Sequence, residues 1–231
     1  MIVKLQGGLG NQMFQYAFGC SLSSKRNETL KLDISSFPDI NERVYCLNQF
    51  SIKAEFASRE ECYRLRYRLQ PLYWRVLCRI FDKPCPPSGP SEQCLQQKIS
   101  EFFTGDIFDR KYNYFDGYWQ NEKYFKDIRE ELVQTFKIVK NPSRACQNYI
   151  EQLKGKCSVS VHIRRGDYAE NPKIKNIHGL LPKEYYIEAM NKIKTSYANP
   201  EFFFFSDDIE WCKLNLSDSG TFIENTTEFE D

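Results

Sequence analysis

Short apolar runs alternate along this chain with stretches in which apolar residues recur every three or four positions. Apolar or strictly alternating runs favour strands, and the wider spacing favours helices that bury one face. Strands are therefore predicted at residues 1–5, 29–34, 98–103, 112–119, 159–163, 201–205 and 221–223. Helices are predicted at residues 12–25, 58–80, 122–136, 143–154, 182–197 and 209–214. Strands that alternate with helices build parallel sheets, so the pattern predicts the α/β class.

A break in the pattern indicates how the chain is divided. Residues 140–142 interrupt the predicted helices, and Gly155 is a natural helix stop. A domain boundary is therefore expected within 138–156. We place an N-terminal domain over residues 1–150 and a second domain over residues 151–231.

Length, composition and charge exclude several classes of protein. The 231 residues suit one large domain or two small ones, and a hydrophobic content of 41% is enough for a core. Lys and Arg number 32 against 31 Asp and Glu, so no overall positive field argues for nucleic acid as a partner. No apolar run reaches the roughly 18 residues of a membrane span.

The beginning of the chain and its cysteines bear on the compartment. The first predicted strand begins at Ile2, so no signal peptide is expected. The nine cysteines form no CxxC pair and are expected to be free thiols in a reducing compartment. The chain is therefore predicted to be cytoplasmic.

The run SVSVHIRRGDY at residues 158–168 ends a predicted strand in two arginines and a glycine turn. Ligands of open α/β sheets bind beyond the carboxyl ends of strands, and guanidinium groups match phosphate oxygens in pairs. Arg164 and Arg165 are therefore predicted to bind a diphosphate, and strand alternation puts His162 on the same face as Arg164. A solvated loop in which Asp167 neutralises one arginine is an equally supported interpretation. His162 by itself would more often be a core residue.

A second polar group follows the apolar strand at 201–205. Ser206, Asp207 and Asp208 stand at its carboxyl end, where acids accept hydrogen bonds from a ribose or a guanine ring. Alternatively, one of the two acids caps the helix at 209–214, because a carboxylate accepts from the free N–H groups of a first helical turn. The pattern supports both hypotheses equally.

The first strand leads into a glycine-rich turn, GGLGN. Gly8 and Gly10, with Asp33 further on, match part of a dinucleotide-binding fingerprint. The third glycine of that fingerprint would fall at Met13, whose side chain blocks close packing of helix on strand, so NAD binding is the weaker hypothesis. We expect instead that the turn lets the backbone approach a ligand, with the amide of Asn11 in a cleft. A purely structural turn is the alternative.

Two further stretches carry aromatic side chains among polar ones. The turn YWQN at 118–121 combines rings with amides, which suits sugar binding, although core packing explains the rings equally well. Arginines and aromatic rings share the helix at 58–80, which Pro71 should kink or divide. A helix of this kind can bind anionic lipid, so peripheral membrane contact through residues 64–79 is one hypothesis. The alternative, which is the more frequent case, is a helix face exposed to solvent.

Four stretches together resemble the signatures of glycosyltransferase family 11, the α-1,2-fucosyltransferases. They are GGLGNQMFQYAFG at 7–19, GYWQNEKYF at 117–125, VHIRRGDY at 161–168 and FFSDDIEWCK at 204–213. The resemblance spans the chain and implies a GT-B-like fold, in which two Rossmann-like domains face a cleft. The N-terminal half would hold the acceptor and the C-terminal half would bind GDP-fucose. The resemblance also implies a further strand and closing helices beyond the last residue given, so the C-terminal domain is expected to be truncated.

The resemblance further implies an inverting transfer of L-fucose from GDP-β-L-fucose to O2 of a terminal galactose. Arg164 would be the main phosphate contact, with Arg165 in support. The catalytic base would be Asp167 or His162, or no strong base would act. The donor-binding residues would be Arg164, Arg165, Ser206, Asp207, Asp208, Gly8, Gly10 and Asn11.

No cofactor or metal ion is expected, because neither an Asp-x-Asp motif nor a zinc-like spacing is evident and the chain has two histidines. Expected acceptors are galactose-terminated oligosaccharides or lipid-linked glycans, such as an O-antigen or a capsule. The rival hypotheses are an NAD-dependent enzyme that uses the N-terminal unit and a non-catalytic glycan-binding protein.

Overall fold

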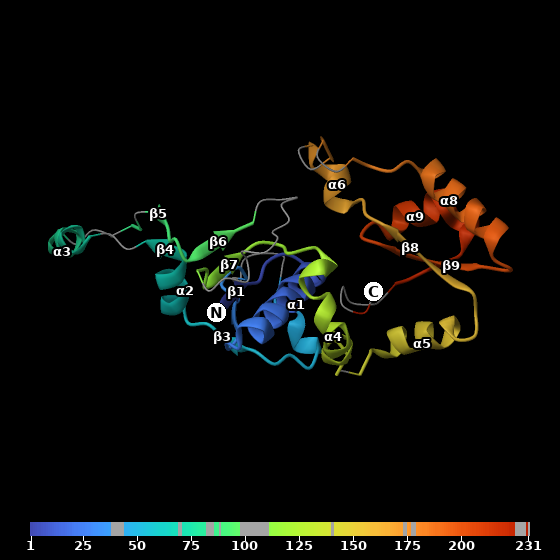
Figure 1. Ribbon diagram of the computed structural model, residues 1–231. Helices are drawn as coiled ribbons and strands as arrows, with labels where there is room; N and C mark the ends of the chain where they lie inside the picture. Colours follow the sequence, from blue (N-terminus) through green and yellow to red (C-terminus); the bar gives the residue numbers. More distant parts are fainter. Residues whose placement is uncertain are drawn as a thin grey trace. The chain divides into compact units, whose positions relative to one another are not determined.

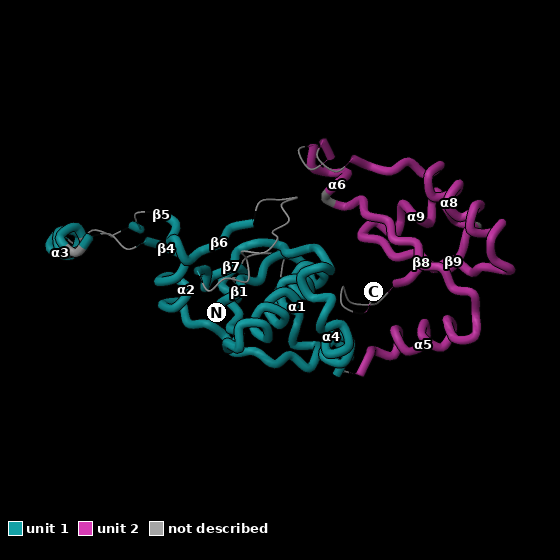
Figure 2. Tube along the Cα trace, viewed as in Figure 1, with its two compact units in different colours: residues 1–140 teal, residues 141–231 magenta. Residues whose placement is uncertain are grey.

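The computed structural model describes residues 1–37, 44–68, 71–81, 86–87, 89–97, 111–139, 141–172, 175–176, 179–224 and 230. The chain forms two compact units, residues 1–140 and 141–231, coloured teal and magenta in Figure 2. The boundary between residues 140 and 141 lies within the range of 138–156 in which we expected it. It precedes the helix predicted at 143–154, most of which our N-terminal domain of residues 1–150 had included. Each unit is described below by itself.

Five strands in the described part of unit 1 form a parallel sheet in the order β3–β2–β1–β7–β6 (Figure 1). The strands are β1 (Ile2–Lys4), β2 (Lys31–Asp33), β3 (Glu55–Phe56), β6 (Cys94–Gln96) and β7 (Tyr114–Asp116). The central strand β1 is buried, with Val3 and the following Leu5 both 0% exposed. Ile2, on the other face of the strand, is 2% exposed, so apolar side chains of β1 are buried on both faces of the sheet.

The described part of unit 1 also contains helices and short turns. They are α1 (Leu9–Arg26), α2 (Arg59–Arg66), α3 (Leu72–Ile80) and α4 (Arg129–Thr135), with 3-10 turns η1 (Leu47–Gln49), η3 (Glu122–Tyr124) and η4 (Lys126–Ile128). The short strands β4 (Tyr67–Arg68) and β5 (Gly89–Pro90) pair antiparallel between α2 and the sheet strand β6. Helix α1 ends at Asn27 in the left-handed conformation, with φ of 54°.

Three predicted elements of unit 1 need correction or comment. The helix predicted at 58–80 is divided, as Pro71 suggested: α2 ends at Arg66, and Pro71 precedes the first turn of α3. The helix predicted at 122–136 is wrong over its first half, where the asparagine cap at Asn121 opens 3-10 turns and α4 begins only at Arg129. The strand predicted at 98–103 lies outside the described residues.

Aromatic rings fill the space between α1 and the end of β7. Trp119 stacks on Phe18 with 4.2 Å between ring centroids and 9° between the planes. Phe115 and Tyr124 meet Phe18 edge-on, with centroids 5.5 Å away in both cases. Trp119 is 0% exposed, so its ring belongs to the core of unit 1 and not to a sugar-binding surface.

Unit 2 is built on a smaller parallel sheet in the order β10–β9–β8. Its strands are β8 (Ser158–Ile163), β9 (Glu201–Ser206) and β10 (Thr221–Phe222). Its helices are α5 (Arg144–Leu153), α6 (Gly166–Glu170), α8 (Lys183–Ser196) and α9 (Ile209–Leu216), followed by the 3-10 turn η5 (Ser217–Ser219). One face of the sheet packs through Ile163, Phe202 and Phe204 against α8 and α9. The predicted α/β class, with a Rossmann-like parallel sheet in each of two units, is confirmed.

Helix α5 belongs to unit 2 because its contacts lie there. The hydroxyl of Tyr149 accepts a hydrogen bond of 3.3 Å from the backbone N–H of Glu224, just after β10. Ser143 caps the helix and accepts from the N–H of Cys146 at 3.2 Å. Local capping thus sets where α5 begins, and the contact with the chain after β10 places it in unit 2.

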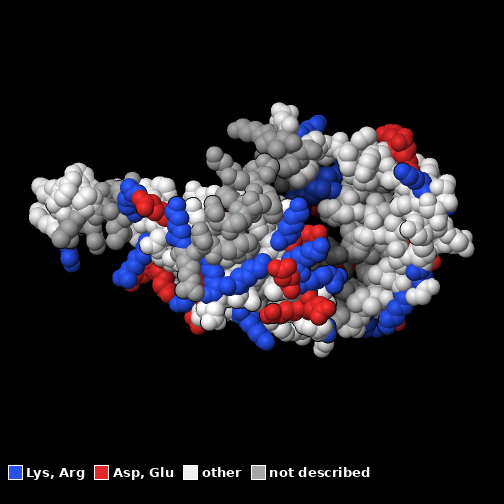
Figure 3. Space-filling view, in the orientation of Figure 1, with Lys and Arg blue, Asp and Glu red and all other residues white. Residues whose placement is uncertain are grey.

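Figure 3 shows the charged side chains on one face of the protein. Basic and acidic side chains are interspersed over unit 1, in keeping with the near balance of 32 cationic and 31 anionic residues. Among the described helices, none is long and apolar enough to cross a membrane. The eight cysteines that the structure describes are free thiols, as predicted.

Candidate functional site

The carboxyl ends of β8 and β9 bring the arginines and the acids of unit 2 together. The two strands pair in register from Ser158 opposite Glu201 to Ile163 opposite Ser206. The hydroxyl of Ser206 donates to the carbonyl of Ile163 at 2.8 Å and accepts from the N–H of Asp208 at 3.0 Å. Ser206 therefore fastens the two strand ends, and the residues that follow them share one edge of the sheet.

Asp207 holds the arginine turn. One of its oxygens accepts from the backbone N–H of Arg165 at 2.8 Å, and the other lies 3.1 Å from a terminal nitrogen of Arg164. A side chain at Gly166 would put its Cβ 2.7 Å from that second oxygen. A larger residue at this position would therefore displace the Asp207 carboxylate from its contact with Arg164.

Asp208 caps α9 and faces Arg165. Its carboxylate accepts from the N–H of Trp211 at 3.2 Å, and its other oxygen lies 3.4 Å from Nε of Arg165. The guanidinium of Arg165 lies over the Trp211 ring, 3.9 Å from the centroid. The capping hypothesis is thus confirmed for Asp208, while Asp207 organises the arginine turn.

The self-paired interpretation of the arginines is partly correct, with different partners from those expected. The structure pairs them with Asp207 and Asp208 across the strand ends, and the side chain of Asp167 is not among those it describes. The Arg164 side chain remains 36% exposed, and its guanidinium lies over the ring of Tyr168, 5.7 Å from the centroid. An anion that arrives at this edge meets two guanidinium groups held in fixed orientations.

His162 lies on β8 on the face opposite the core. The register places it beside Phe205, and its side chain is exposed, whereas the next residue, Ile163, is fully buried. It is therefore not the satisfied core histidine that was the alternative. Its exposure makes it available for proton transfer.

The glycine turn after β1 lies in unit 1, so Gly8, Gly10 and Asn11 sit at the edge of the other sheet. Gly8 is the N-terminal cap residue of α1 in extended conformation, and a Cβ at Gly10 would meet open space. Gly7 is the residue that needs glycine, since its φ is +79° and a Cβ there would clash with Nδ2 of Asn11. The amide oxygen of Asn11 accepts from Nε2 of Gln120 at 2.6 Å.

A strained turn carries Gln120. Trp119 has a φ of +55°, a left-handed conformation that is rare for bulky residues and costs about 1–3 kcal/mol. Its N–H donates to Oε1 of Gln97 at 2.7 Å, and the buried Gln15 donates to the carbonyl of Gly117 at 3.1 Å. The core of unit 1 therefore holds a backbone conformation that the local sequence disfavours, which is common at functional sites.

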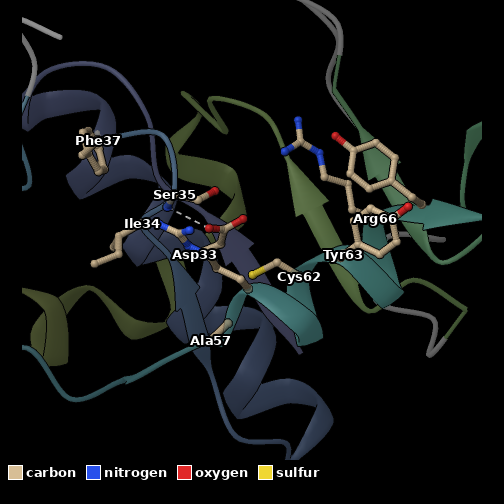
Figure 4. Close-up of a pocket in the computed structure, with 10 residues that line it drawn as sticks. Asp33, Ile34, Ser35, Phe37, Ala57, Cys62, Tyr63 and Arg66 are labelled. Atoms are coloured by element: carbon tan, nitrogen blue, oxygen red, sulfur yellow. Dashed lines mark hydrogen bonds between the residues drawn. The ribbon is translucent and has the colours of Figure 1, made fainter. Parts of the chain in front are cut away.

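A cavity of about 680 Å³ opens at the carboxyl end of β2. Figure 4 shows Asp33 at its base, with Cys62 and Arg66 of helix α2 on one side. Asp33 accepts from the hydroxyl of Tyr114 at 2.5 Å and from the N–H of Ser35 at 2.8 Å. Both carboxylate oxygens thus accept hydrogen bonds within unit 1, and Asp33 is 2% exposed, which argues against the ribose contact of a dinucleotide fingerprint.

The protonation of this cluster follows from its contacts. Burial alone would raise the pKa of Asp33, but hydrogen bonds from Tyr114, Ser35 and Cys62 outweigh it and leave the pKa lowered. Burial, with the nearby carboxylate, raises the pKa of the Cys62 thiol to about 12. Asp33 is therefore an ionised structural carboxylate, surrounded by neutral donors.

A second charged cluster lies beside the cavity and escaped the sequence analysis. Lys4 approaches Asp116 at 3.1 Å, and Arg66 approaches the same carboxylate at 3.4 Å. Nε of Arg66 is buried without a hydrogen-bond partner. Lys4 and Asp116 are the last residues of β1 and β7. They become neighbours because these two strands pair, which the sequence does not show. Among the described residues, no group of three or more His, Cys, Asp and Glu could hold a metal ion.

Comparison with known proteins now decides the family. The sequence profile of glycosyl transferase family 11 matches residues 97–228, more than half of the chain. This chain belongs to glycosyl transferase family 11. An alpha-1,2-colitosyltransferase of Escherichia coli is 35% identical over 99% of this chain and 78% of its own length. The O-antigen biosynthesis glycosyltransferase WbnK of Escherichia coli is 31% identical over 98% of this chain and 79% of its own length.

More distant relatives of this glycosyltransferase match as well. The galactoside 2-alpha-L-fucosyltransferase SEC1 of Bos taurus is 27% identical over 94% of this chain and 52% of its own length. Among solved structures, the fucosyltransferase NodZ from Bradyrhizobium superposes with a TM-score of 0.49 and 12% identity, over 97% of this chain and 78% of that chain.

The lowered pKa of Asp33 predicts how the stability of unit 1 depends on pH. A carboxyl whose pKa is lower in the folded than in the unfolded state stabilises the fold above its unfolded pKa, about 3.9, and this contribution is lost as pH falls through the folded pKa. Asp33→Asn should therefore flatten the acid limb of unfolding free energy against pH, measured by urea denaturation between pH 3 and 7.

The exposed Asp127 provides the matched control, because its side chain is 71% exposed and forms an ion pair with Lys25 on the surface. Asp127→Asn should keep the wild-type acid limb. The same slope in wild type and Asp33→Asn would contradict the assignment of Asp33 as an ionised structural carboxylate.

Proposed function

We propose that this family 11 glycosyltransferase transfers L-fucose from GDP-β-L-fucose to O2 of a terminal galactose of a glycan acceptor. The observation that carries the proposal is the pair of guanidinium groups at the carboxyl edge of β8, held by Asp207 and Asp208. Support for the donor and the linkage comes from the names of the relatives, among them galactoside 2-alpha-L-fucosyltransferases.

The chemistry of the leaving group explains why arginines are needed. In the proposed reaction, O2 of galactose attacks C1 of fucose while the bond from C1 to the diphosphate oxygen breaks, and GDP departs with the electron pair. Negative charge develops on the β-phosphate, and fixed cations placed there stabilise the transition state. Arg164, the more exposed of the two, is proposed as the principal phosphate contact, with Arg165 behind it.

The remaining groups of the reaction are proposed from position. The acceptor hydroxyl loses its proton as the new bond forms, to His162 or Asp167, the polar residues nearest the arginines along the chain. The transition state is oxocarbenium-like, and holding donor and acceptor in line supplies much of the acceleration. No metal ion or other cofactor is assigned a role.

The acceptor is proposed to be a galactose-terminated oligosaccharide or a lipid-linked glycan, reached at the cytoplasmic face of a membrane. Helix α3 supports peripheral contact, since Tyr73 is 67% exposed and Ile80 is 68% exposed. Arg79 lies in its last turn. An amphipathic helix with exposed apolar and basic residues binds at the interface of an anionic bilayer.

A second donor has a specific observation in its favour. The relative that is 35% identical over nearly the whole chain is named a colitosyltransferase. Colitose is the 3-deoxy counterpart of L-fucose, so a GDP-sugar site that accepts one sugar presents the same diphosphate to the arginines for the other. GDP-colitose is therefore the alternative donor.

Arg164→Ala should lower the turnover number by about 10²- to 10³-fold, the usual loss when one transition-state contact is removed. Turnover is measured by release of GDP with a galactoside acceptor, and folding by circular dichroism. Arg144→Ala removes the same charge from an exposed position on α5 and should leave turnover unchanged. Wild-type turnover in Arg164→Ala would remove the proposed role of the arginine edge.

Donor preference separates the two GDP-sugars from the rival functions. GDP-fucose is expected to bind by calorimetry and to yield a fucosylated galactoside, identified as the O2 linkage by NMR. UDP-galactose and NADH should show no binding. Product from GDP-colitose alone would transfer the proposal to the second donor, and binding of NADH without GDP binding would reject both.

Removal of divalent cations should not change the rate. After dialysis against EDTA, turnover with GDP-fucose should match that of the untreated enzyme, because guanidinium groups are proposed to neutralise the diphosphate. A loss of activity that added Mg²⁺ or Mn²⁺ restores would contradict this part of the mechanism.

A further inference from the structure

The two turns at the centre of the unit 1 sheet lie where parallel sheets bind ligands. The strand order β3–β2–β1–β7–β6 reverses direction at β1, because the chain passes from β1 to β2 on one side while β7 pairs on the other. Ligands of open α/β sheets bind at such a switch point, beyond the carboxyl ends of the strands. The turn GGLGN follows β1 there, and the turn GYWQN follows β7.

A hydrogen bond between the two turns sets which way the Asn11 amide faces. Nε2 of Gln120 donates to Oδ1 of Asn11 at 2.6 Å. With its oxygen engaged in this way, the half-buried Asn11 has its amide N–H groups left to donate, and its Nδ2 lies beside the backbone of Gly7. Gly7 leaves the space that this arrangement needs, since a Cβ there would clash with Nδ2 of Asn11.

The strained turn of β7 presents Gln120 outward. The Trp119 ring is anchored by its stack on Phe18, and its N–H is held by Gln97. The residues on either side, Tyr118 and Gln120, are exposed. The core holds Trp119 in the left-handed conformation, and the same turn exposes the phenol of Tyr118 and the amide of Gln120. Such backbone strain is common at functional sites.

The chemistry of this surface differs from that of the arginine edge in unit 2. None of the residues in GGLGN or GYWQN carries a formal charge. Amides and an exposed phenol ring match the hydroxyls and the apolar face of an uncharged sugar, whereas a diphosphate needs the cations that unit 2 provides.

We propose that Asn11 and Gln120 form a subsite for an uncharged sugar of the acceptor, in which the Asn11 amide donates to a sugar oxygen. Gln120 is a positioning residue that keeps the Asn11 oxygen turned away from the sugar. The inference rests on the proposed function for its acceptor, and it assigns the turns of unit 1 to carbohydrate and not to the nucleotide.

Substitutions of Gln120 test the polarity of the Asn11 amide. Gln120→Glu replaces a donor by an acceptor of the same size, so the Asn11 amide must turn over and offer its oxygen to the sugar. The KM for a galactoside acceptor should rise at least tenfold in Gln120→Glu and less in Gln120→Ala. The dissociation constant of GDP should be unchanged in both. In an Asn11→Ala background, the Glu and Ala variants at residue 120 should have equal KM values.

The control variant is Gln134→Glu, which adds the same charge at an exposed position of α4 in the same unit. Its KM should equal that of the wild type. Saturation-transfer NMR with methyl β-galactoside and the full chain reports sugar binding without any donor. Transfer should be strong in wild type and Gln134→Glu and reduced in Gln120→Glu.

The outcomes separate this subsite from the proposed function. Equal KM values and equal saturation transfer in Gln120→Glu and Gln134→Glu would overturn the subsite, as would absence of transfer to the wild type. If neither fucose nor colitose is transferred while galactoside binding still depends on Gln120, the subsite stands and the proposed donor fails.

Discussion

Burial of the apolar strand residues in each sheet is the constraint on which both units depend. Val3 and Leu5 around β1, and Ile163 and Phe204 of β8 and β9, are fully buried, whereas the other face of β8 is exposed at Ser160 and His162. The side chains with chemistry to offer gather where the strands end. The arginine turn, the acids and the glycine turn therefore all lie at carboxyl edges, where side chains and backbone N–H groups reach a ligand together.

The turns at the two edges differ in charge. In unit 2, carboxylates and the ring of Trp211 hold the guanidinium groups in fixed orientations. The carboxylates also neutralise part of their positive charge. In unit 1, the turns that meet at the switch point are neutral and linked by an amide pair. The proposed function needs both kinds of surface, because the proposed donor carries a charged diphosphate and the proposed acceptor sugar is uncharged.

Several features could be predicted because they depend on residues close together in the sequence. The capping box of Ser58 and Glu61, the cap at Ser143 and the apolar strand before Ser206 each have local signatures. The helix predicted at 122–136 failed, because its spacing of apolar residues matched a helix while the cap at Asn121 started 3-10 turns instead. The partners of Arg164 and Arg165 were missed, because they lie some forty residues away on the next strand.

The sequence by itself determined the α/β class, the polar residues at strand ends and, through four motifs, the family to which the chain belongs. Only the tertiary structure decided which of those residues meet. Pairing of β8 with β9 brings Asp207 to Arg164, and pairing of β1 with β7 brings Gln120 to Asn11. The physical reason is that spacing along a chain encodes which face a side chain takes, whereas strand order, which arises from packing of the whole unit, selects its neighbours.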